Sequence, residues 1–230
     1  MANLYVLFYP FSRIPSSIPN SQQLTLSEEY TEKLPIHINS GWLHEFKWSP
    51  NLPANEDNIF RTMPQVLYLF INTKRKEPTF DYLYIQDGIW AISEFFLKYL
   101  RENIGSQIEA VPLKVYNKNR EEAQRVYYAM RVHAFNDKLF DFHVESKKRT
   151  AGIKNYYLYP DMELKETNEK QNIYTLREFN YREVLILNSV AKNWIIENLY
   201  SPQIYKLSDF PYVLNNQYDK KALSIIPPLP

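Results

Sequence analysis

An arginine, a histidine and an aspartate lie close together in one stretch of the chain and have side chains that can do chemistry. Arg131 and His133 alternate with apolar residues in RVYYAMRVHAF, and Asp137 follows shortly after them. A histidine beside a carboxylate and a guanidinium can move protons and hold an anionic substrate. The same residues also fit a half-exposed strand whose polar side chains bond to their neighbours. An enzyme with its site at His133, Arg131 and Asp137 is therefore an alternative hypothesis.

Other patterns that carry chemistry are missing from the sequence. The four glycines are too far apart to form a phosphate-binding loop, and there is no cysteine. His44-Glu45 lacks the second histidine of a zinc protease helix, and His143-x-Glu145 lacks the paired cysteines of a zinc deaminase. No Gly-x-Ser-x-Gly turn is present to expose a nucleophilic serine. We predict no catalytic residue, no cofactor and no metal site.

Composition and charge limit the classes of partner. The chain has 230 residues and a net charge of +1, so it has no general electrostatic field for nucleic acid or anionic lipid. The start, MANLYVLFYPFSR, lacks a basic residue before its apolar run and is interrupted by Pro10, which favours a first strand over a signal peptide. No apolar run is long enough to cross a bilayer. We expect a cytoplasmic protein with no membrane partner.

Two short basic clusters suggest a second alternative. Thr73–Lys76 reads TKRK and Lys147–Arg149 reads KKR, and tyrosines lie near both. Such clusters can bind RNA phosphates while the aromatic rings stack on bases. Because both clusters are short and flanked by acidic residues, a solvated turn is the favoured interpretation and nucleic acid is not favoured as a partner.

The chain changes character near residue 80. Eight of the prolines precede that point, which predicts a mainly β N-terminal lobe over residues 1–80. We expect an α+β domain over residues 81–215 and an extended or disordered tail over residues 216–230, where prolines cluster. Gln65–Ile71 is the clearest strand of the lobe, and Asp87-Gly88 between two apolar runs predicts a hairpin. The stretch LFDFHVE alternates like a strand, and VESKKRTAG after it has the composition of a turn.

Two segments of the chain repeat one pattern of residue types. Ile89–Ile92 and Val184–Leu187 are apolar runs of strand length, and each leads into a polar residue that suits a helix N-cap, Ser93 or Asn188. Each predicted helix is followed by another strand, over Ile108–Tyr116 and Ile204–Leu207. The spacing predicts one buried stripe on each helix, made of Phe95, Phe96, Tyr99 and Leu100 in the first and of Val190, Ala191, Trp194 and Ile195 in the second. We predict an α+β fold with mixed, mostly antiparallel sheets and two similar strand–helix–strand modules, each packing one helix.

Aromatic residues are unusually frequent at 16% of the chain. Two stretches mix them with charged residues, Gly41–Trp48 and Lys154–Glu169. Both fit a core strand followed by a polar loop, and both also fit an interface, where tyrosine and tryptophan are enriched. The candidate partner-binding residues are Trp42, Trp48, Tyr156, Tyr157, Tyr159, Asp161, Glu163, Glu166 and Glu169.

The chain resembles a known family over residues 80–209. Three segments carry the resemblance, IWAISEFFLKYLRENIGSQIEAVPLKV, RVYYAMRVHAFNDKLFDFHVESKK and NIYTLREFNYREVLILNSVAKNWIIENLYSPQIYKL. They are similar to the immunity proteins of bacterial polymorphic toxin systems, particularly immunity protein 43. The resemblance implies an α+β protein without enzymatic activity that binds and neutralises a toxin encoded by a neighbouring gene. It brings no catalytic residues with it, and the toxin's activity and the oligomeric state stay open.

Overall fold

The computed structural model describes residues 3–33, 62–73, 77–104, 108–151, 156–165 and 171–230. It divides the chain into two compact units. Unit 1 consists of Met1–Ile14, Asn103–Ser106 and Phe135–Pro230, and unit 2 consists of Pro15–Glu102 and Gln107–Ala134. The first residues of the chain therefore share a unit with its C-terminal part. The predicted division into residues 1–80, 81–215 and 216–230 stays a prediction.

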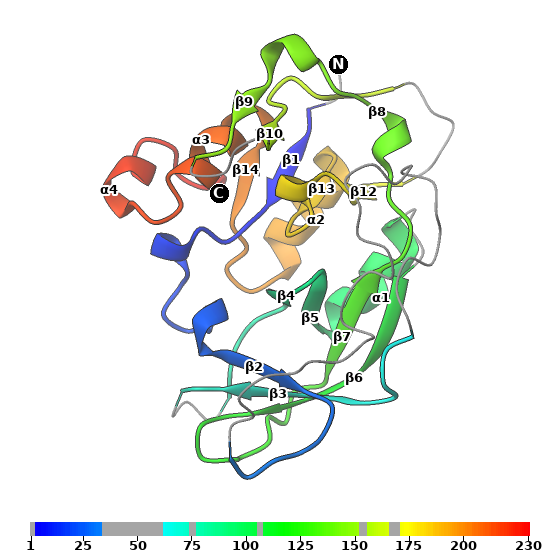
Figure 1. Ribbon diagram of the computed structural model, residues 1–230, viewed down its shortest axis with the longest axis vertical. Helices are drawn as coiled ribbons and strands as arrows, with labels where there is room; N and C mark the ends of the chain where they lie inside the picture. The colour runs from blue at the N-terminus through cyan, green and yellow to red at the C-terminus, as the bar shows by residue number, and fades with distance from the viewer. Residues whose placement is uncertain (1–2, 34–61, 74–76, 105–107, 152–155, 166–170) are drawn as a thin grey trace. The chain divides into compact units, whose positions relative to one another are not determined.

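Unit 2 is built around a six-stranded sheet with the order β2-β3-β6-β7-β5-β4 (Figure 1). Only β3 and β6 pair in parallel, and every other neighbouring pair is antiparallel. Together with the helices, this confirms the predicted α+β class with mixed, mostly antiparallel sheets. The strands are β2 (Leu24–Ser27), β3 (Leu67–Ile71), β4 (Tyr82–Gln86), β5 (Ile89–Ser93), β6 (Ile108–Tyr116) and β7 (Tyr127–Val132).

The predicted hairpin at Asp87-Gly88 is present between β4 and β5. Both turn residues have positive φ angles, 46° at Asp87 and 73° at Gly88. Two successive positive angles are typical of a type I′ turn, whose twist matches that of the strands it joins. Glycine adopts this geometry without steric cost, which explains the dipeptide found here.

Strand β7 differs from the half-exposed strand that its alternating sequence predicts. Five of its six residues are buried, and Arg131, which we expected on a solvent-facing side, has no exposed surface. His133, just after the strand, is also buried. The prediction was wrong because alternation shows on which face a side chain lies but not whether that face is exposed, and Glu109 provides a partner for Arg131 and His133.

Unit 1 contains a four-stranded antiparallel sheet with the order β12-β13-β1-β14. The N-terminal segment supplies β1, as its sequence predicts. Val6 pairs with Ile186 on one side and with Tyr205 on the other, so these side chains share one face of the sheet. The strands are β1 (Tyr5–Leu7), β12 (Ile173–Tyr174), β13 (Leu185–Leu187) and β14 (Ile204–Lys206).

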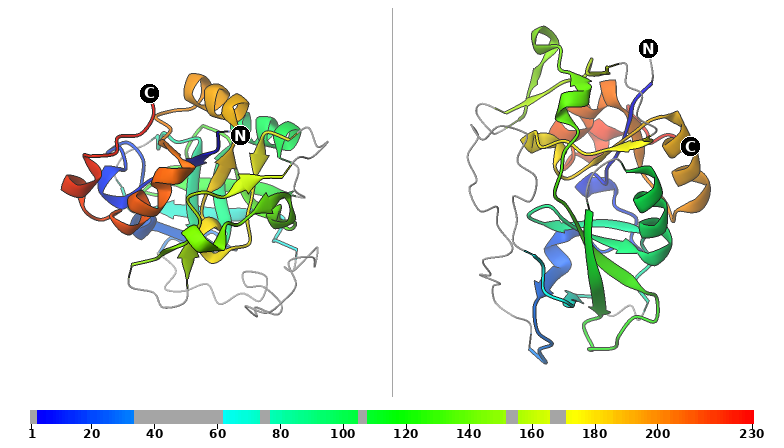
Figure 2. Two further views of the ribbon diagram at one scale, coloured as in Figure 1. Left: turned by 90° about the horizontal axis from the view of Figure 1, so that it is seen from above. Right: turned by 90° about the vertical axis from the view of Figure 1, so that its right-hand side faces the viewer.

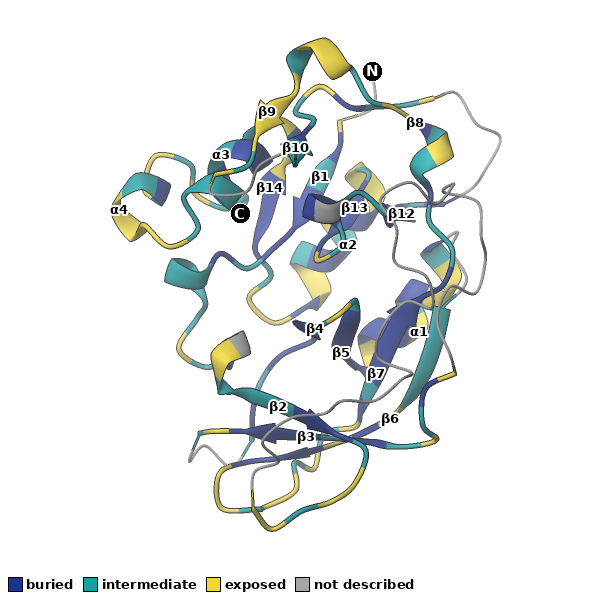
Figure 3. Cartoon of the chain, viewed as in Figure 1, coloured by how far each residue is buried: buried dark blue, intermediate teal, exposed yellow. Residues whose placement is uncertain are grey.

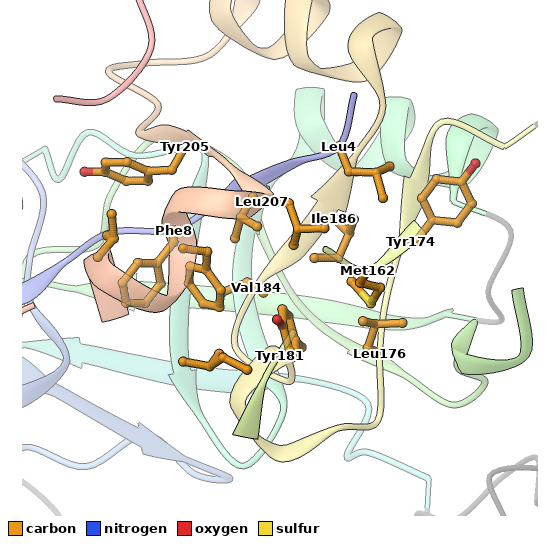
Figure 4. Close-up of a cluster of buried hydrophobic side chains, with 14 of the residues drawn as sticks. Leu4, Phe8, Met162, Tyr174, Leu176, Tyr181, Val184, Ile186, Tyr205 and Leu207 are labelled. Carbon is orange, nitrogen blue, oxygen red and sulfur yellow. The ribbon is translucent and has the colours of Figure 1, made fainter. Parts of the chain in front are cut away.

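That face of the sheet supports the core of unit 1 (Figure 4). Phe8 packs edge to face against Phe210, with ring centroids 5.5 Å apart. The ring centroid of Tyr181 lies 5.4 Å from that of Phe210. The core also contains residues that precede, separate or follow the sheet strands in the sequence, namely Met162, Leu176, Val184 and Leu207. Helix α2 (Ser189–Asn198) lies on the other side of the sheet (Figure 2). On that side, Lys192 Nζ is 5.2 Å from the centroid of the Tyr5 ring.

Shorter elements complete unit 1. Strand β8 (Phe140–Asp141) covers only the start of the strand predicted in LFDFHVE, and the predicted turn after it contains strand β9 (Lys148–Arg149). β8 pairs with β11 (Glu163–Leu164), and β9 pairs with β10 (Tyr157–Leu158). Its other helices are α3 (Phe210–Asn215) and α4 (Lys220–Leu223), and its 3-10 helices are Phe11–Arg13, Asp137–Leu139, Val144–Ser146, Phe179–Tyr181 and Leu207–Asp209. Helix α1 (Glu94–Asn103), apart from its last residue, and the 3-10 helix Ser21–Gln23 belong to unit 2.

The C-terminal segment is attached to unit 1. The guanidinium of Arg13 donates to the carbonyl of Ile226, at 2.7 Å, and to that of Leu223 at the end of α4. The amide of Leu229 donates to the carbonyl of Ile204 on the edge strand β14, at 2.8 Å. These bonds satisfy a helix end and a strand edge that would otherwise face solvent.

The two repeated segments have the same topology. β5, α1 and β6 follow one another in sequence. In the sheet, β7 lies between β5 and β6 and pairs antiparallel with each of them. β13, α2 and β14 also follow one another, and β1 takes the intervening position. In each segment the helix therefore joins two parallel strands that do not pair with each other. Their description as equivalent modules stays an interpretation.

Both predicted helix caps form, but the buried stripes are narrower than predicted. Ser93 Oγ accepts the amide of Phe96 at 3.3 Å, and Asn188 Oδ1 accepts the amide of Ala191 at 3.0 Å. The buried residues are Phe96, Leu97 and Leu100 in α1 and Ala191 and Ile195 in α2. Phe95 and Val190 are exposed, and Tyr99 and Trp194 are only partly buried. Residues next to the stripe are rotated away from it by about 100° per position.

The two sides of α2 predict different costs of truncation. Ile195→Ala should lower the free energy of unfolding by about 2 to 5 kcal/mol, because its side chain is fully buried. Val190→Ala should change it by less than about 0.5 kcal/mol, because its side chain is mostly exposed. Urea titrations of both variants measure the difference, and equal losses would contradict the assignment of the buried side.

Candidate partner-binding surface

The structure places five of the predicted partner-binding residues in one continuous part of unit 1. Tyr156 precedes β10 and Tyr157 begins it, Tyr159 and Asp161 lie in the following turn, and Glu163 begins β11. The other four predicted residues, Trp42, Trp48, Glu166 and Glu169, lie outside the described residues.

The β9–β10 hairpin is held from one side by a buried asparagine. Asn180 Nδ2 donates to Thr150 Oγ1 at 2.6 Å and to the carbonyl oxygen of Tyr157 at 2.9 Å. The Asn180 side chain therefore bonds at once to the segment that follows β9 and to β10. Because Asn180 is itself buried, water cannot replace these partners, and losing the bonds would leave its side-chain amide unsatisfied.

A second asparagine holds the other strand. Asn215, the last residue of α3, donates from Nδ2 to the carbonyl of Arg149 at 3.0 Å, and its Oδ1 accepts the amide of Ala151 at 2.8 Å. The amide of Thr150 also donates to the carbonyl of Tyr156 at 3.2 Å. The backbone of the hairpin is thus fixed by residues that lie far from it in sequence.

Tyr159 belongs to the packing of unit 1 rather than to its outer surface. Its ring meets Phe142 edge to face at 5.1 Å, and its amide donates to the hydroxyl of Tyr181 at 2.8 Å. Burial raises the pKa of the Tyr159 hydroxyl, and the neighbouring Glu178 raises it further. Tyr159 therefore helps to position the surface segment on the core.

Tyr157 lies on the outer side of the hairpin beside basic side chains. It pairs across the strands with Arg149, and Lys147 Nζ lies 4.2 Å from the centroid of its ring. Lys147, Lys148 and Arg149 are all exposed. The sequence predicts a solvated turn here, whereas the structure shows a paired strand, which gives these cations a fixed backbone.

Acidic side chains follow further along the same segment. Asp161 is exposed, and Glu163 Oε2 lies 4.0 Å from His143 Nε2. His143 Nδ1 is 3.4 Å from Glu145 Oε1, so the imidazole lies between two carboxylates. The candidate surface thus has a basic end and an acidic end.

The alternative enzyme site is replaced by a different, buried cluster in unit 2. Glu109 Oε2 accepts from Arg131 at 3.0 Å and lies 2.8 Å from His133 Nε2, and Glu109 Oε1 accepts the amide of Met63 at 2.6 Å. Glu109 and Arg131 face each other across β6 and β7. The side chain of Arg131 is fully buried, so it cannot contact a substrate in this arrangement.

Ionisation of this cluster follows from its bonds. Burial by itself would raise the pKa of Glu109, but the bonds from His133, the Met63 amide and Arg131 outweigh it, so the pKa is lowered. Burial lowers the pKa of Arg131, and the bond to Glu109 opposes that effect. The carboxylate is the counterion that keeps a buried guanidinium charged.

Asp137 has another role and belongs to unit 1. Its carboxylate oxygens accept the backbone amide of Arg177, at 3.0 and 3.2 Å. Burial raises the pKa of Asp137 despite these bonds, and burial together with Asp137 raises the pKa of Glu178. The carboxylate beside Arg131 and His133 is therefore Glu109 and not Asp137, the acid named in the alternative hypothesis of an enzyme site.

Within the described residues, no three histidine, cysteine, aspartate or glutamate side chains are grouped as metal ligands would be. Among the helices in the described parts of the chain, none combines the length and apolar character needed to cross a membrane.

The fold is of the α+β class, and its fixed hairpin carries the mixture of aromatic and charged side chains that is typical of protein interfaces. A family model described as immunity protein 43 matches residues 11–222 of the chain. The protein therefore belongs to the immunity protein 43 family, a family of immunity proteins of toxin systems, which confirms the resemblance stated from the sequence. No curated protein matches the chain.

Sequence reasoning missed the residues that organise both sites. Glu109 lies in a strand that was predicted correctly, and an acid opposite an arginine in the neighbouring strand is the signal that would have found it. Asn180 and Asn215 carry no such signal, because asparagine in a loop or at a helix end has common local roles.

The buried cluster predicts a pH-dependent loss of stability when its carboxylate is removed. Glu109→Gln should lower the free energy of unfolding at neutral pH by about 3 to 5 kcal/mol, because Arg131 then stays buried without a counterion. The pKa of Glu109 is lowered in the folded protein, so its contribution is fully present above the unfolded pKa of about 4.3 and is lost as the pH falls through the folded pKa. The difference between wild type and variant should therefore shrink in acid.

Urea titrations at several pH values measure this difference. Glu102→Gln is the control, because Glu102 is exposed at the end of α1 and its loss should cost less than about 0.5 kcal/mol at any of these pH values. A difference between wild type and Glu109→Gln that stays constant with pH would contradict the assigned ionisation.

Proposed function

We propose that this protein protects a cell by binding and neutralising a cognate toxin domain encoded by a neighbouring gene. It acts in the cytoplasm through a stoichiometric complex and catalyses no reaction. The observation that carries this proposal is family membership, since the immunity protein 43 model matches residues 11–222. The sequence resemblance covers a narrower part of the chain and leads to the same function.

The geometry of the charged residues supports binding rather than catalysis. Glu109, Arg131 and His133 bond to one another inside a sheet, where they stabilise the fold. Side chains suited to recognition lie instead on the hairpin and turn of unit 1, with Tyr157 beside cations and Asp161 exposed. Tyrosine supplies contact area at low entropic cost and keeps a polar group for hydrogen bonding.

The surface proposed for the toxin runs along the segment from Tyr156 to Glu163. Tyr156 and Tyr157 are its candidate aromatic anchors, and Asp161 and Glu163 form an acidic rim. Tyr159 contributes by holding this segment on the core. Glu166, Glu169, Trp42 and Trp48 stay part of the proposal as residues outside the described ranges.

Coexpression tests the proposed function. Cells that produce the toxin domain of the neighbouring gene should grow only when this protein is present, and the two purified proteins should elute together in a fixed ratio. Failure of the purified wild type to bind that toxin, together with failure to protect, would contradict the immunity role.

The acidic rim has its own test. Asp161→Lys combined with Glu163→Lys should weaken the complex by about tenfold, because opposite charges on a rim mainly govern the association rate. The fold should persist, since Asp161 is exposed and 46% of the Glu163 side chain is exposed. If the variant binds with unchanged affinity and still protects cells, Asp161 and Glu163 are not part of the interface, but the immunity role stands.

A further inference from the structure

The basic end of the hairpin is a preformed face made of Lys147, Arg149 and Tyr157, which we call the cationic face. Cross-strand partners point to the same side of a sheet, and Tyr157 pairs with Arg149. Lys147 is two residues before Arg149, so its side chain returns to that side, as its distance of 4.2 Å from the Tyr157 ring confirms. In the next pair, Leu158 lies on the opposite side and is fully buried in the core of unit 1, while the side chain of its partner Lys148 is exposed.

This face is fixed in a way that most lysine and arginine clusters are not. Asn215 holds the carbonyl of Arg149, and Asn180 holds the carbonyl of Tyr157. Figure 3 shows β9 as an exposed strand, although α3, whose Asn215 bonds to it, is largely buried or intermediate. A partner therefore meets a backbone that is already ordered, so less conformational entropy is lost on binding.

The charges of the cationic face are not neutralised within the described part of the chain. None of Lys147, Lys148 and Arg149 forms an ion pair with a carboxylate there. The nearby Glu145 lies beside His143 instead, at 3.4 Å. Adjacent exposed cations repel one another, and an anionic partner would relieve that repulsion.

We propose that the cationic face binds an acidic patch on the cognate toxin domain, an inference that rests on the proposed immunity function. Arg149 offers a planar fork of donors to a carboxylate, and Lys147 offers a second charge beside it. The Tyr157 ring lies beneath Lys147 and supplies apolar contact at the centre. The toxin then contacts a surface with a basic end at β9 and an acidic end at Asp161.

The same features favour a protein over RNA as the occupant. A base that stacks on the face of the Tyr157 ring next to Lys147 must first displace Lys147. A carboxylate needs no such displacement, because it can approach the ammonium from outside. The net charge of +1 also provides little long-range attraction for a polyanion.

Charge reversal on the intact protein tests the inference. Lys147→Glu combined with Arg149→Glu should weaken binding of the purified toxin domain by about 10- to 100-fold, mainly through slower association. Wild-type affinity should fall as salt is raised, and the variant's affinity should depend less on salt. Both measurements use the full chain and the toxin domain as the probe.

A matched control separates the local face from net charge. Lys220→Glu combined with Lys221→Glu makes the same change in charge on the exposed α4 of the same unit, and it should leave affinity within about twofold of wild type. Lys147→Gln with Arg149→Gln is the milder variant, and it should weaken binding in the same direction. Thermal melts should be unchanged for all three variants.

The outcomes distinguish the two proposals. If wild type binds and protects but the reversal at Lys147 and Arg149 leaves affinity unchanged, or the α4 control weakens it equally, the cationic face is wrong and the immunity function stands. If wild type does not bind the toxin, both fail. Loss of binding to a single-stranded RNA oligonucleotide, with toxin affinity unchanged, would overturn the inference in favour of nucleic acid.

Discussion

Backbone pairing by β1 is the constraint on which unit 1 depends. β13 and β14 are joined by a helix, run parallel and do not pair with each other, so the N-terminal strand between them completes both ladders. Asn180 precedes β13, and Asn215 follows β14 at the end of α3. The sheet therefore also determines where these two asparagines stand, and through them the position of the β9–β10 hairpin.

The two units use charged residues in opposite ways. In unit 2, Glu109 neutralises Arg131 inside the sheet and accepts a backbone amide with its other oxygen, so the charges serve the fold. In unit 1, Lys147 and Arg149 stand outside on a fixed backbone. A buried charge without a partner is costly, whereas an exposed one remains solvated and available for recognition.

Local features of the fold were predictable from sequence, and the assignment of faces was less so. The turn at Asp87-Gly88, the caps at Ser93 and Asn188 and the α+β class were all expected and are present. The exposure of Arg131 was predicted wrongly, because alternation shows that a side chain lies on one side of a strand but not what that side meets. For the candidate surface, the sequence favours the tyrosines and acids, but it predicts a turn where Lys148 and Arg149 form a strand.

Caps, tight turns and the apolar runs of the strands can be predicted from the sequence alone, because they depend on residues within a few positions of one another. The folded structure was needed to show that Glu109 meets Arg131, that β1 lies between β13 and β14, and that Asn215 bonds to Arg149. These contacts join segments that are distant along the chain. Periodicity records how a side chain is oriented in its own element, but the partner on the other side is selected by packing and hydrogen bonding of the whole fold.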